Sequence, residues 1–416
     1  MNILLINHYA GTPALGMEYR PYYLAREWVR AGHRVQVLAA NFSHVRSQQP
    51  AAGDERIDGI HYAWLPTPAY RGNGFGRLKN ILSFLSQVAA LTPRLVAEFK
   101  PDIVISSSTY PMDHWVARRI ARAAGAKLVH EVHDLWPLSL IELAGLSSWH
   151  PLVLVCGSAE RAAYRHSDVV VSMLPKVHDH MSRRGLDLQK LAIVPNGISP
   201  EEWPADLSED RRGGLQPAPL RADVEEAIDA ARRSGAVIVA YAGSMGAPNA
   251  LDTLLDAAAL LRDKKIHIVL VGDGHERERL ARRIAAEALA KVRLLPPIAK
   301  AQIPSFLRAI DIAYIGWLPM PIYRFGIAPN KLLDYMMAAR PVVHSVAAGN
   351  DPVAEAGCGL TVAPGAPEEV AGALSQLAAL SPKQRRVFGD KGRVYVLAQH
   401  AYPVLAQRFL DAVGVR

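Results

Sequence analysis

The chain has 416 residues, enough for two or three domains of roughly 100 to 200 residues each. Its composition is 50% hydrophobic and 21% charged, with 30 Gly and 29 Pro, which excludes a disordered, collagen-like or low-complexity protein. Residues 1–200 hold 21 Lys and Arg against 15 Asp and Glu, so most of the net charge of +8 lies in the first half. A basic excess suits nucleic acid, anionic lipid or a phosphate-bearing substrate. No Lys/Arg run interleaved with aromatic residues marks a nucleic-acid face, so we expect no nucleic-acid partner.

The cysteine content and the hydropathy of the chain indicate in which cellular compartment the protein is expected. Cys156 and Cys358 are too few for a disulfide framework or a Cys-based zinc site. No stretch approaches the roughly 18 consecutive apolar residues that a spanning helix needs, and the first residues lack the pattern of a signal peptide. We therefore expect two reduced thiols in a cytoplasmic protein that is neither secreted nor transmembrane.

The first half alternates short apolar runs with helical patterns. The apolar run 2–7 is followed by a Gly-containing loop at 8–18, a helical pattern and a second apolar run at 35–39. This order is a βαβ unit, whose crossover requires a parallel sheet. Further strands are predicted at residues 102–106, 127–132, 168–172 and 191–194. Five or six parallel strands result.

The second half repeats this rhythm. Residues 196–214 are rich in Pro, Gly, Ser and charges, which predicts a domain boundary there. Strands are predicted beyond it at residues 236–242, 267–271, 292–295, 310–315, 341–345 and 360–362, with a helix at 251–261. The predicted fold class is therefore α/β, with two doubly wound parallel-sheet Rossmann-like domains facing a cleft. These domains are residues 1–200 and 201–397, and we expect a helix at about 398–416 to pack back on the first.

The stretch from Tyr323 to Met336 carries the clearest chemical signal. Pro329 suits the first helical position, and a helix N-terminus offers unpaired amides and partial positive charge to a diphosphate. Lys331 would place a cation near those phosphates. Asp334 lies on the same helix face and can accept hydrogen bonds from ribose hydroxyls. On spacing alone, a solvated ion pair between Lys331 and Asp334 explains the pattern equally well.

A second candidate site lies in Val129–Asp134. The strand period sends His130 to one face and Glu131 and His133 to the other, so the two histidines do not converge on a metal. A buried structural histidine is one interpretation of His133, but its position at a strand end facing the cleft favours a functional role. Glu18 fits a charge at a helix N-terminus and an acceptor-side base equally well. No Asp-x-Asp pair occurs in the chain, so we expect neither a metal nor another cofactor.

Several segments resemble family 4 of the glycosyltransferases with the GT-B fold, in order and spacing across nearly the whole chain. They are Gly243-Ser244-Met245-Gly246 and residues 194–198, 270–280 and 323–336. Residues 8–11, 16–21 and 133–137 resemble a narrower branch of bacterial surface-polysaccharide enzymes that includes N-acetyl-L-fucosamine transferases. The resemblance implies a retaining enzyme that moves a sugar from a UDP-sugar to a lipid-linked saccharide in O-antigen or capsule synthesis. The implied sugar is an N-acetylated hexosamine or a 6-deoxyhexosamine such as N-acetyl-L-fucosamine.

The resemblance also implies residue roles. It places His133 beside the transferred sugar, Gly16 in a loop facing the donor phosphates, and Asp334 on ribose as the second acid of the family's Glu-x7-Glu pattern. The predicted catalytic residues are His133 and Glu18, and the predicted donor-binding residues are Gly16, Gly243, Ser244, Asn249, Gly272, Gly326, Ile327, Asn330, Lys331 and Asp334.

Three positions depart from the family pattern. Gly326 stands where the first acid is expected, so the sugar contact must come from backbone amides or elsewhere. The loop after Gly243 has Pro248-Asn249 where many relatives carry a basic phosphate ligand, and Lys331 is the candidate replacement. Ala339 stands where a helix-ending Gly is usual, which costs about 1 kcal/mol if the residue is left-handed.

Residues 70–85 predict an attachment to the anionic inner face of the cytoplasmic membrane. Basic residues surround Phe75 there, and each contributes about 1 kcal/mol near an anionic leaflet. Leucines recur at helical spacing and can enter the interface or pack on the sheet, and for the later part of the helix we favour packing. The exposed candidates for the membrane or acceptor are then Arg71, Phe75, Arg77 and Lys79.

Three other classes of protein compete with this interpretation. A nucleotide-sugar epimerase of similar fold would need no acceptor and would want further acids and histidines in the cleft. A dinucleotide oxidoreductase is disfavoured, because neither Gly243–Gly246 nor Gly272–Gly274 completes Gly-x-Gly-x-x-Gly after its strand. A non-catalytic membrane scaffold would not be stabilised by UDP.

Overall fold

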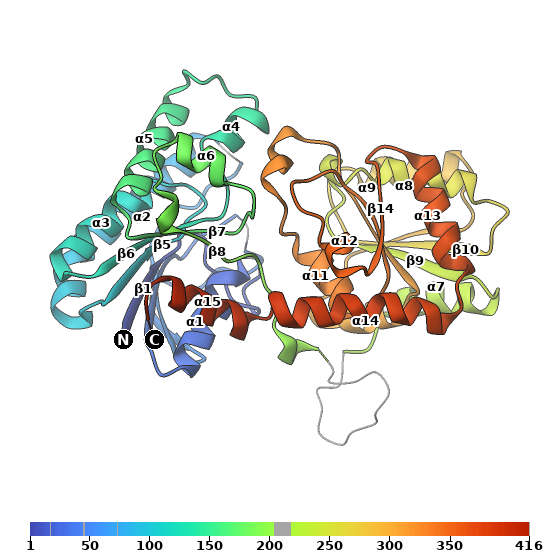
Figure 1. Cartoon of the computed structure of the whole chain (residues 1–416), viewed down its shortest axis with the longest axis horizontal. Coiled ribbons are helices and arrows are strands. Elements are labelled where there is room, and N and C mark those ends of the chain that lie inside the picture. Colours follow the sequence, from blue (N-terminus) through green and yellow to red (C-terminus); the bar gives the residue numbers. More distant parts are fainter. Residues whose placement is uncertain (17, 45, 73, 204–217, 416) are drawn as a thin grey trace. The chain divides into compact units, whose positions relative to one another are not determined.

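The computed structural model describes residues 1–416 except 17, 45, 73, 204–217 and 416. It divides the chain into two compact units (Figure 1). Unit 1 comprises Met1–Asn196 and Tyr402–Arg416, and unit 2 comprises Gly197–Ala401. Most of the predicted linker, residues 204–214, lies outside the described residues. No helix in the described part of the chain is long and apolar enough to cross a membrane.

Unit 1 contains an eight-stranded sheet in the order β3-β4-β2-β1-β5-β6-β7-β8. Its strands are β1 (Asn2–Ile6), β2 (Arg34–Ala40), β3 (Gly53–Ile57), β4 (Ile60–Leu65), β5 (Ile103–Ser106), β6 (Lys127–Val132), β7 (Val169–Ser172) and β8 (Leu191–Ile193). Every neighbouring pair is parallel except β3 and β4. The central strands read as continuous apolar runs because both faces of the sheet are covered.

Helices cover both faces of this sheet. The unit 1 helices are α1 (Tyr19–Arg30), α2 (Phe75–Arg94), α3 (Asp113–Ala124), α4 (Leu138–Glu142), α5 (Pro151–His166), α6 (His178–Arg183) and α15 (Tyr402–Ala412). Residues of α1 and α15 share one hydrophobic core with one face of the sheet, whereas α2 and α3 share a second core with the other face.

The β3–β4 hairpin is the element that the sequence analysis missed. Asp58 and Gly59 make the turn with φ values of 47° and 81°, as a two-residue hairpin loop requires. β3 is exposed except for half-buried Ile57, so it lacks the apolar run by which six strands of this sheet were found. β4 is almost entirely buried, so it does have an apolar run, which the sequence analysis did not recognise. The sheet therefore has eight strands rather than the predicted five or six.

Unit 2 contains a six-stranded, fully parallel sheet in the order β11-β10-β9-β12-β13-β14. Its strands are β9 (Val237–Ala242), β10 (Ile266–Val271), β11 (Val292–Leu295), β12 (Ile312–Gly316), β13 (Val342–Ser345) and β14 (Gly359–Val362). Its helices are α7 (Ala222–Arg233), α8 (Leu251–Leu260), α9 (Arg277–Ala286), α10 (Ile303–Ala309), α11 (Asn330–Met337), α12 (Pro352–Ala356), α13 (Pro367–Ala379) and α14 (Pro382–Gln399).

The two faces of the unit 2 sheet carry separate cores. Residues of α7, α10 and α11 pack on one face and residues of α8 and α13 on the other. Ala339, just after α11, is left-handed with a φ of 52°, the conformation that a Gly usually takes at this place. Two parallel-sheet α/β units of this kind confirm the predicted fold class.

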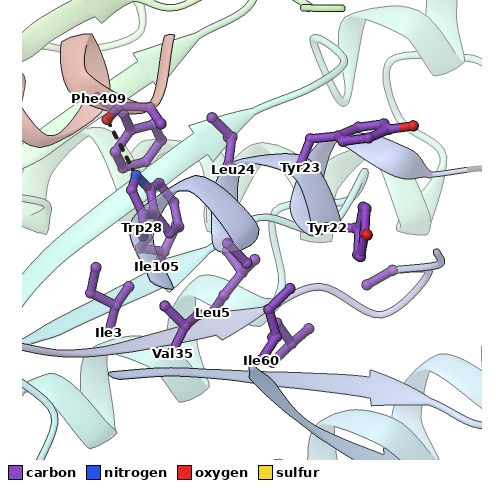
Figure 2. Packing of buried hydrophobic residues seen from close by; sticks show 14 of the residues in the cluster. Ile3, Leu5, Tyr22, Tyr23, Leu24, Trp28, Val35, Ile60, Ile105 and Phe409 are labelled. Carbon is purple, nitrogen blue, oxygen red and sulfur yellow. Dashed lines mark hydrogen bonds between the residues drawn. The ribbon is translucent and has the colours of Figure 1, made fainter. Parts of the chain in front are cut away.

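The C-terminal helix α15 completes the core of unit 1. Figure 2 shows Phe409 of α15 against Trp28 of α1, with the two ring centroids 5.1 Å apart. The indole nitrogen of Trp28 also donates a hydrogen bond of 3.2 Å to the carbonyl of Ala406. Both rings are buried, so α15 supplies apolar area that α1 and the sheet cannot supply alone.

Replacing Phe409 with Ala should therefore lower the free energy of unfolding by about 3 to 5 kcal/mol, because a buried aromatic ring is lost and a cavity remains. Urea denaturation measures the change. Gln407→Ala, an exposed position on the same helix, is the matched control and should change little. A loss below about 1 kcal/mol for Phe409→Ala would contradict this account of α15.

Candidate active site

The strand order of unit 2 reverses between β9 and β12. Connections from these two central strands diverge to opposite faces of the sheet, so their carboxyl ends leave an opening in which open α/β sheets bind ligands. The loop after β9 begins at Gly243, and the segment after β12 leads into α11. The predicted donor residues of unit 2 therefore come from the loops at one edge of this sheet.

Glycines allow the loops after β9 and β10 to approach each other. Gly272 has a φ of 156°, and a Cβ atom there would lie 1.9 Å from the carbonyl oxygen of Gly243. Gly274 similarly approaches the carbonyl oxygen of Met245, where a Cβ would lie 2.5 Å away. Backbone hydrogen bonds join the two loops, from Gly243 to Val271 at 3.0 Å and from Met245 to Asp273 at 2.7 Å. Side chains at Gly272 and Gly274 would force these loops apart.

Lys331 reaches from α11 into this loop region. Its ammonium group donates hydrogen bonds of 2.7 Å to the Tyr241 hydroxyl and of 2.7 Å to the Asn249 amide oxygen, and it lies 4.5 Å from the centroid of the Tyr241 ring. A Cβ atom on Gly243 would stand only 3.1 Å from the Lys331 nitrogen. The structure thus brings Gly243, Asn249 and Lys331 together as predicted.

The partners of Lys331 decide between the two interpretations of its spacing with Asp334. Both of its hydrogen-bond partners are neutral, and the described residues offer it no ion pair. Burial lowers the pKa of Lys331 to about 7. A solvated ion pair with Asp334 is therefore excluded. The Lys331 side chain is half-buried, and no described carboxylate pairs with its ammonium group.

Asp334 occupies the next turn of α11. Burial raises the pKa of its carboxyl group to about 7, with Lys300 opposing the rise and Glu202 adding to it. Those two residues form an ion pair of 2.9 Å. No described residue hydrogen-bonds the Asp334 carboxylate, which leaves its oxygen atoms available as acceptors.

The segment before α11 differs from its prediction in detail. The helix begins at Asn330, and Pro329 is the N-cap residue with extended backbone angles rather than the first helical residue. Gly326 has a φ of 100° and suits the turn that delivers the chain to the helix. The Ile327 amide donates a 2.7 Å hydrogen bond to the Asn350 side chain, so this amide is already in use. The amides of the first turn, at Asn330 and Lys331, lack intrahelical acceptors.

Ser244 completes the set of predicted donor residues. Its side chain is exposed, and its carbonyl oxygen accepts a 2.5 Å hydrogen bond from the Tyr241 hydroxyl. Tyr241 was not predicted, although it holds both this loop and Lys331. Its contact with Lys331 spans 90 positions of the chain and leaves no local pattern in the sequence.

Unit 1 has the corresponding reversal between β1 and β5. His133 directly follows β6, and its Nε2 atom lies 2.9 Å from the Ser107 hydroxyl and 3.3 Å from Glu131 Oε2. His130 faces the other way and lies 2.9 Å from the Ser106 hydroxyl. The predicted alternation along this strand is confirmed. Among the residues that the structure describes, no group of three or more His, Cys, Asp or Glu side chains could hold a metal.

Glu131 is the buried anion of this cluster. Arg20 contacts its Oε1 atom through Nε at 2.9 Å, and through a terminal nitrogen at 2.8 Å. Burial alone would raise the pKa of Glu131, but the Arg20 charge and the hydrogen bonds from His133 and Ser107 outweigh it and hold the pKa well below its usual range. Burial likewise opposes protonation of His133, yet the hydrogen bond and charge of Glu131 leave its pKa above the ordinary value.

Glu18 stands beside this cluster, at the start of α1. It is left-handed, with a φ of 67°, and its side chain makes no capping hydrogen bond to the helix. Burial raises the pKa of Glu18, with the His133 charge opposing the rise. Glu18 is thus the N-cap residue of α1 without a capping hydrogen bond, and it interacts electrostatically with His133. Both interpretations of Glu18 therefore remain open.

Gly16 lies in the loop that precedes Glu18. Its φ is 100°, and a Cβ atom there would lie 2.8 Å from the Ser47 hydroxyl oxygen. Gly16 also forms an isolated bridge to Arg46. Its glycine character is thus explained by close packing within unit 1.

Arg77 is the candidate whose surroundings differ from the expectation. It was predicted to be exposed, but it is half-buried, donates a 3.1 Å hydrogen bond to the Tyr9 hydroxyl and lies over the Tyr9 ring at 5.5 Å. Arg71, Phe75 and Lys79 are exposed as predicted. Among the leucines of α2, Leu85 is half-buried whereas Leu78 and Leu82 are exposed.

Comparison with known proteins identifies the class. Residues 16–197 match the family model described as a glycosyl transferase 4-like domain, and residues 236–379 match the model described as glycosyl transferases group 1. Together the matches span most of both units. The chain belongs to the glycosyltransferases and has the GT-B fold.

Individual relatives are distant. The putative colanic acid biosynthesis glycosyl transferase WcaI of Escherichia coli strain K12 is 22% identical over 296 residues, or 68% of this chain and 69% of that protein. Sucrose-phosphate synthase of Thermosynechococcus elongatus superposes with a TM-score of 0.72 at 18% identity, covering 99% of this chain and 98% of that one. HepE of Anabaena, in complex with UDP and glucose, superposes with a TM-score of 0.65 at 15% identity over 100% and 99% of the chains.

The raised pKa of Asp334 has a consequence for stability. A carboxyl group whose folded-state pKa is about 7 favours folding below the unfolded pKa, and this contribution is lost as the pH rises toward 7. An Asn side chain does not ionise, so its contribution to the free energy of unfolding does not change with pH. The unfolding free energy of Asp334→Asn relative to the native chain should therefore rise by about 2 to 3 kcal/mol between pH 5 and pH 8.

Urea denaturation at the two pH values measures this difference. Asp263→Asn, which alters an exposed carboxylate of the same unit, should show little change. A difference for Asp334→Asn that does not depend on pH would contradict the description of its carboxyl group.

Proposed function

We propose that this glycosyltransferase moves a sugar from a UDP-sugar to a lipid-linked saccharide with retention of configuration, in the synthesis of a bacterial surface polysaccharide. The observation that carries the proposal is the Lys331 ammonium group. The Lys331 side chain is half-buried and forms hydrogen bonds only with neutral groups among the described residues. It lies in the first turn of α11, at the edge of the parallel sheet where the strand order reverses.

This arrangement suits a diphosphate. The free amides of the first turn of α11 contribute partial positive charge. A bound anion would stabilise the charged form of Lys331 in place of the water that burial removes, so Lys331 would add a full positive charge. Asp334 on the next turn can accept hydrogen bonds from ribose hydroxyls. The loops around this position contain Gly243, Ser244, Asn249 and Gly272. Because the two glycines have no side chain, a ligand can approach the backbone there.

The comparisons support the donor and the biological role. HepE, a distant structural neighbour, is known in complex with UDP and glucose. WcaI is described as a putative colanic acid biosynthesis glycosyl transferase. The sugar, an N-acetylated hexosamine or 6-deoxyhexosamine such as N-acetyl-L-fucosamine, is proposed only from the resemblance of residues 8–11, 16–21 and 133–137.

Transfer needs charge stabilisation more than acid–base chemistry on the protein. The transition state is oxocarbenium-like, and the departing diphosphate gains negative charge. Lys331 and the α11 amides stabilise that charge where it develops. His133 is assigned to the transferred sugar, with Gly16 on the phosphate side and Glu18 on the acceptor side. Gly326 and Ile327 line the turn before α11 in place of the family's first acid, and no metal or other cofactor is invoked.

The epimerase alternative is not favoured, because both matching family models describe glycosyl transferases. An epimerase would alter a free nucleotide sugar with no acceptor present. Incubating the protein with donor alone, and analysing the nucleotide sugar afterwards, separates the two reactions.

Lys331→Ala should weaken UDP binding by roughly 1 to 3 kcal/mol, since one charged hydrogen-bond donor to the diphosphate is lost. Calorimetric titration with UDP measures the change. Lys264→Ala removes an exposed charge from the same unit and should leave the affinity as it is. Equal UDP affinity in the native chain and in Lys331→Ala would reject the phosphate assignment.

Unit 1 carries a surface that fits an anionic membrane. α2, α3 and α5 connect parallel strands, so all three begin at the carboxyl edge of the sheet, and α3 contacts both of the others (Figure 1). Large apolar side chains are exposed near their N-terminal ends. They are Phe75, Leu78 and Leu82 of α2, Trp115 of α3, Leu154 and Val155 of α5, and Trp149 just before α5.

The charge of these three helices has one sign at the surface. All of their residues are described, and their acidic residues, Asp113 and Glu160, are buried. Their exposed charged residues are Lys79, Arg94, Arg119, Arg122, Arg161 and Arg165. Arg94, Arg122 and Arg165 lie in the last turns of these helices, away from the apolar ends, and Arg94 pairs with exposed Glu98 at 2.9 Å. Lys79 of α2, which begins with exposed Phe75, is the exposed basic residue nearest an apolar end. We assign the apolar ends with such neighbouring basic residues to peripheral attachment at the inner face of the cytoplasmic membrane.

Replacing Arg71, Phe75 and Lys79 together with Ser should reduce binding to vesicles containing anionic lipid, and turnover on a lipid-linked acceptor with it. UDP binding should be unaffected. Arg282→Ser combined with Lys383→Ser removes equal charge from exposed positions of unit 2 and serves as the control. Vesicle binding equal to that of the native chain would contradict the membrane assignment.

A further inference from the structure

Glu131 is a buried acid that the proposed function leaves unused, and its contacts define the state of His133. We propose that Glu131, held by Arg20, is a positioning residue that fixes the His133 imidazole with Nε2–H turned inward and leaves Nδ1 for the donor substrate. This inference rests on the proposed function, because it takes His133 to face the transferred sugar. Glu131, Ser107 and Arg20 were not among the predicted site residues.

The hydrogen positions follow from donor and acceptor chemistry. The Ser107 hydroxyl lies 2.6 Å from Glu131 Oε2, and an ionised carboxylate only accepts, so the single hydroxyl proton points to Glu131. The Ser107 oxygen then has only lone pairs to offer His133 Nε2 at 2.9 Å. Nε2 must therefore carry a proton, which both Ser107 and Glu131 accept.

The opposite edge of the ring is open. Nδ1 of His133 has no hydrogen-bond partner among the described residues, yet it is not among the buried side-chain atoms that lack one. It is therefore the edge that a substrate can reach. Neutral His133 would present an acceptor there, and protonated His133 would present a donor.

Arg20 anchors the whole arrangement. Besides its two contacts with Glu131, it donates hydrogen bonds of 2.5 Å to the carbonyl of Pro195 and of 2.8 Å to that of Val194. The guanidinium group thus ties α1 to β6 and to the segment after β8. Because these contacts fix the planar guanidinium group, Arg20 holds the Glu131 carboxylate in one orientation.

The charged and titratable groups around His133 come from several elements of unit 1. Those that interact with it electrostatically are Glu131 and His130 of β6, Glu18 and Arg20 at the start of α1, Asp113 of α3, and neighbouring Asp134. Burial and Arg20 oppose a charge on the imidazole, whereas Glu131 and Glu18 favour it. Because Glu131 adds a hydrogen bond to its charge, its removal should lower the pKa of His133.

NMR spectroscopy of the free protein with 15N-labelled histidine tests the arrangement without any substrate. The chain has 15 histidines, and His133→Gln identifies the resonances of His133. At high pH we expect the Nε2–H tautomer, and in Glu131→Gln a downward shift of the His133 pKa. Glu160→Gln is the matched control, since Glu160 is also a buried acid paired with an arginine, Arg184, at 2.7 Å, and it should not shift that pKa.

Kinetics then test whether the arrangement matters for transfer. Glu131→Gln should lower kcat at pH 8 by roughly 100-fold, the size of effect expected when protonated His133 no longer donates a charged hydrogen bond to the sugar, and move the alkaline limb of the pH profile to lower pH. The Kd for UDP should stay constant, because the nucleotide site is in unit 2. Glu160→Gln should leave the position of that limb unchanged, even where it reduces stability.

The outcomes separate the inference from the proposed function. An Nδ1–H tautomer at high pH, or the same His133 pKa in Glu131→Gln and the native chain, would overturn the positioning role. The expected NMR result with an unmoved pH profile would overturn its part in transfer. Failure to detect transfer from any UDP-sugar would reject the proposed function, while the NMR result would still decide the role of Glu131.

Discussion

Both candidate sites depend on one constraint, which is that all strands of a parallel sheet end at the same edge. Where the strand order reverses, adjacent connections leave to opposite faces and the edge stays open. In unit 1 this places the segments after β1, β5 and β6 together, and in unit 2 the segments after β9, β10 and β12. Residues distant in the chain therefore meet there, as Lys331 meets Tyr241 and Arg20 meets Glu131.

The two sites differ in whether the protein itself compensates their buried charges. In unit 1, Arg20, Glu131 and His133 compensate one another through hydrogen bonds, so their positions are set before any substrate arrives. In unit 2, Lys331 has neutral partners, and burial lowers its pKa to about 7. A charge that lacks a counterion in the protein is suited to one that a ligand supplies. This difference fits the division of roles proposed above, in which unit 1 positions the sugar and unit 2 binds the diphosphate.

Local patterns in the sequence predicted the fold better than the contacts of the site. Apolar runs located β1 and β6, and alternation along β6 correctly placed Glu131 and His133 on one face. In the β3–β4 hairpin, β3 is polar and lacked such a run. The apolar run of β4 and the Asp58-Gly59 turn were present in the sequence but were not recognised. The hydrogen bonds of Lys331 to Tyr241 and of Arg77 to Tyr9 could not be predicted, because they arise from tertiary packing between segments far apart in the chain.

A crystal structure with UDP tests the central claim most directly. The account predicts the diphosphate at the first turn of α11, with an oxygen atom within hydrogen-bond distance of the Lys331 nitrogen and the ribose hydroxyls near Asp334. Lys331 would then exchange at least one of its bonds to Tyr241 and Asn249 for the phosphate. A diphosphate bound elsewhere, with Lys331 still bonded to both side chains, would contradict the account.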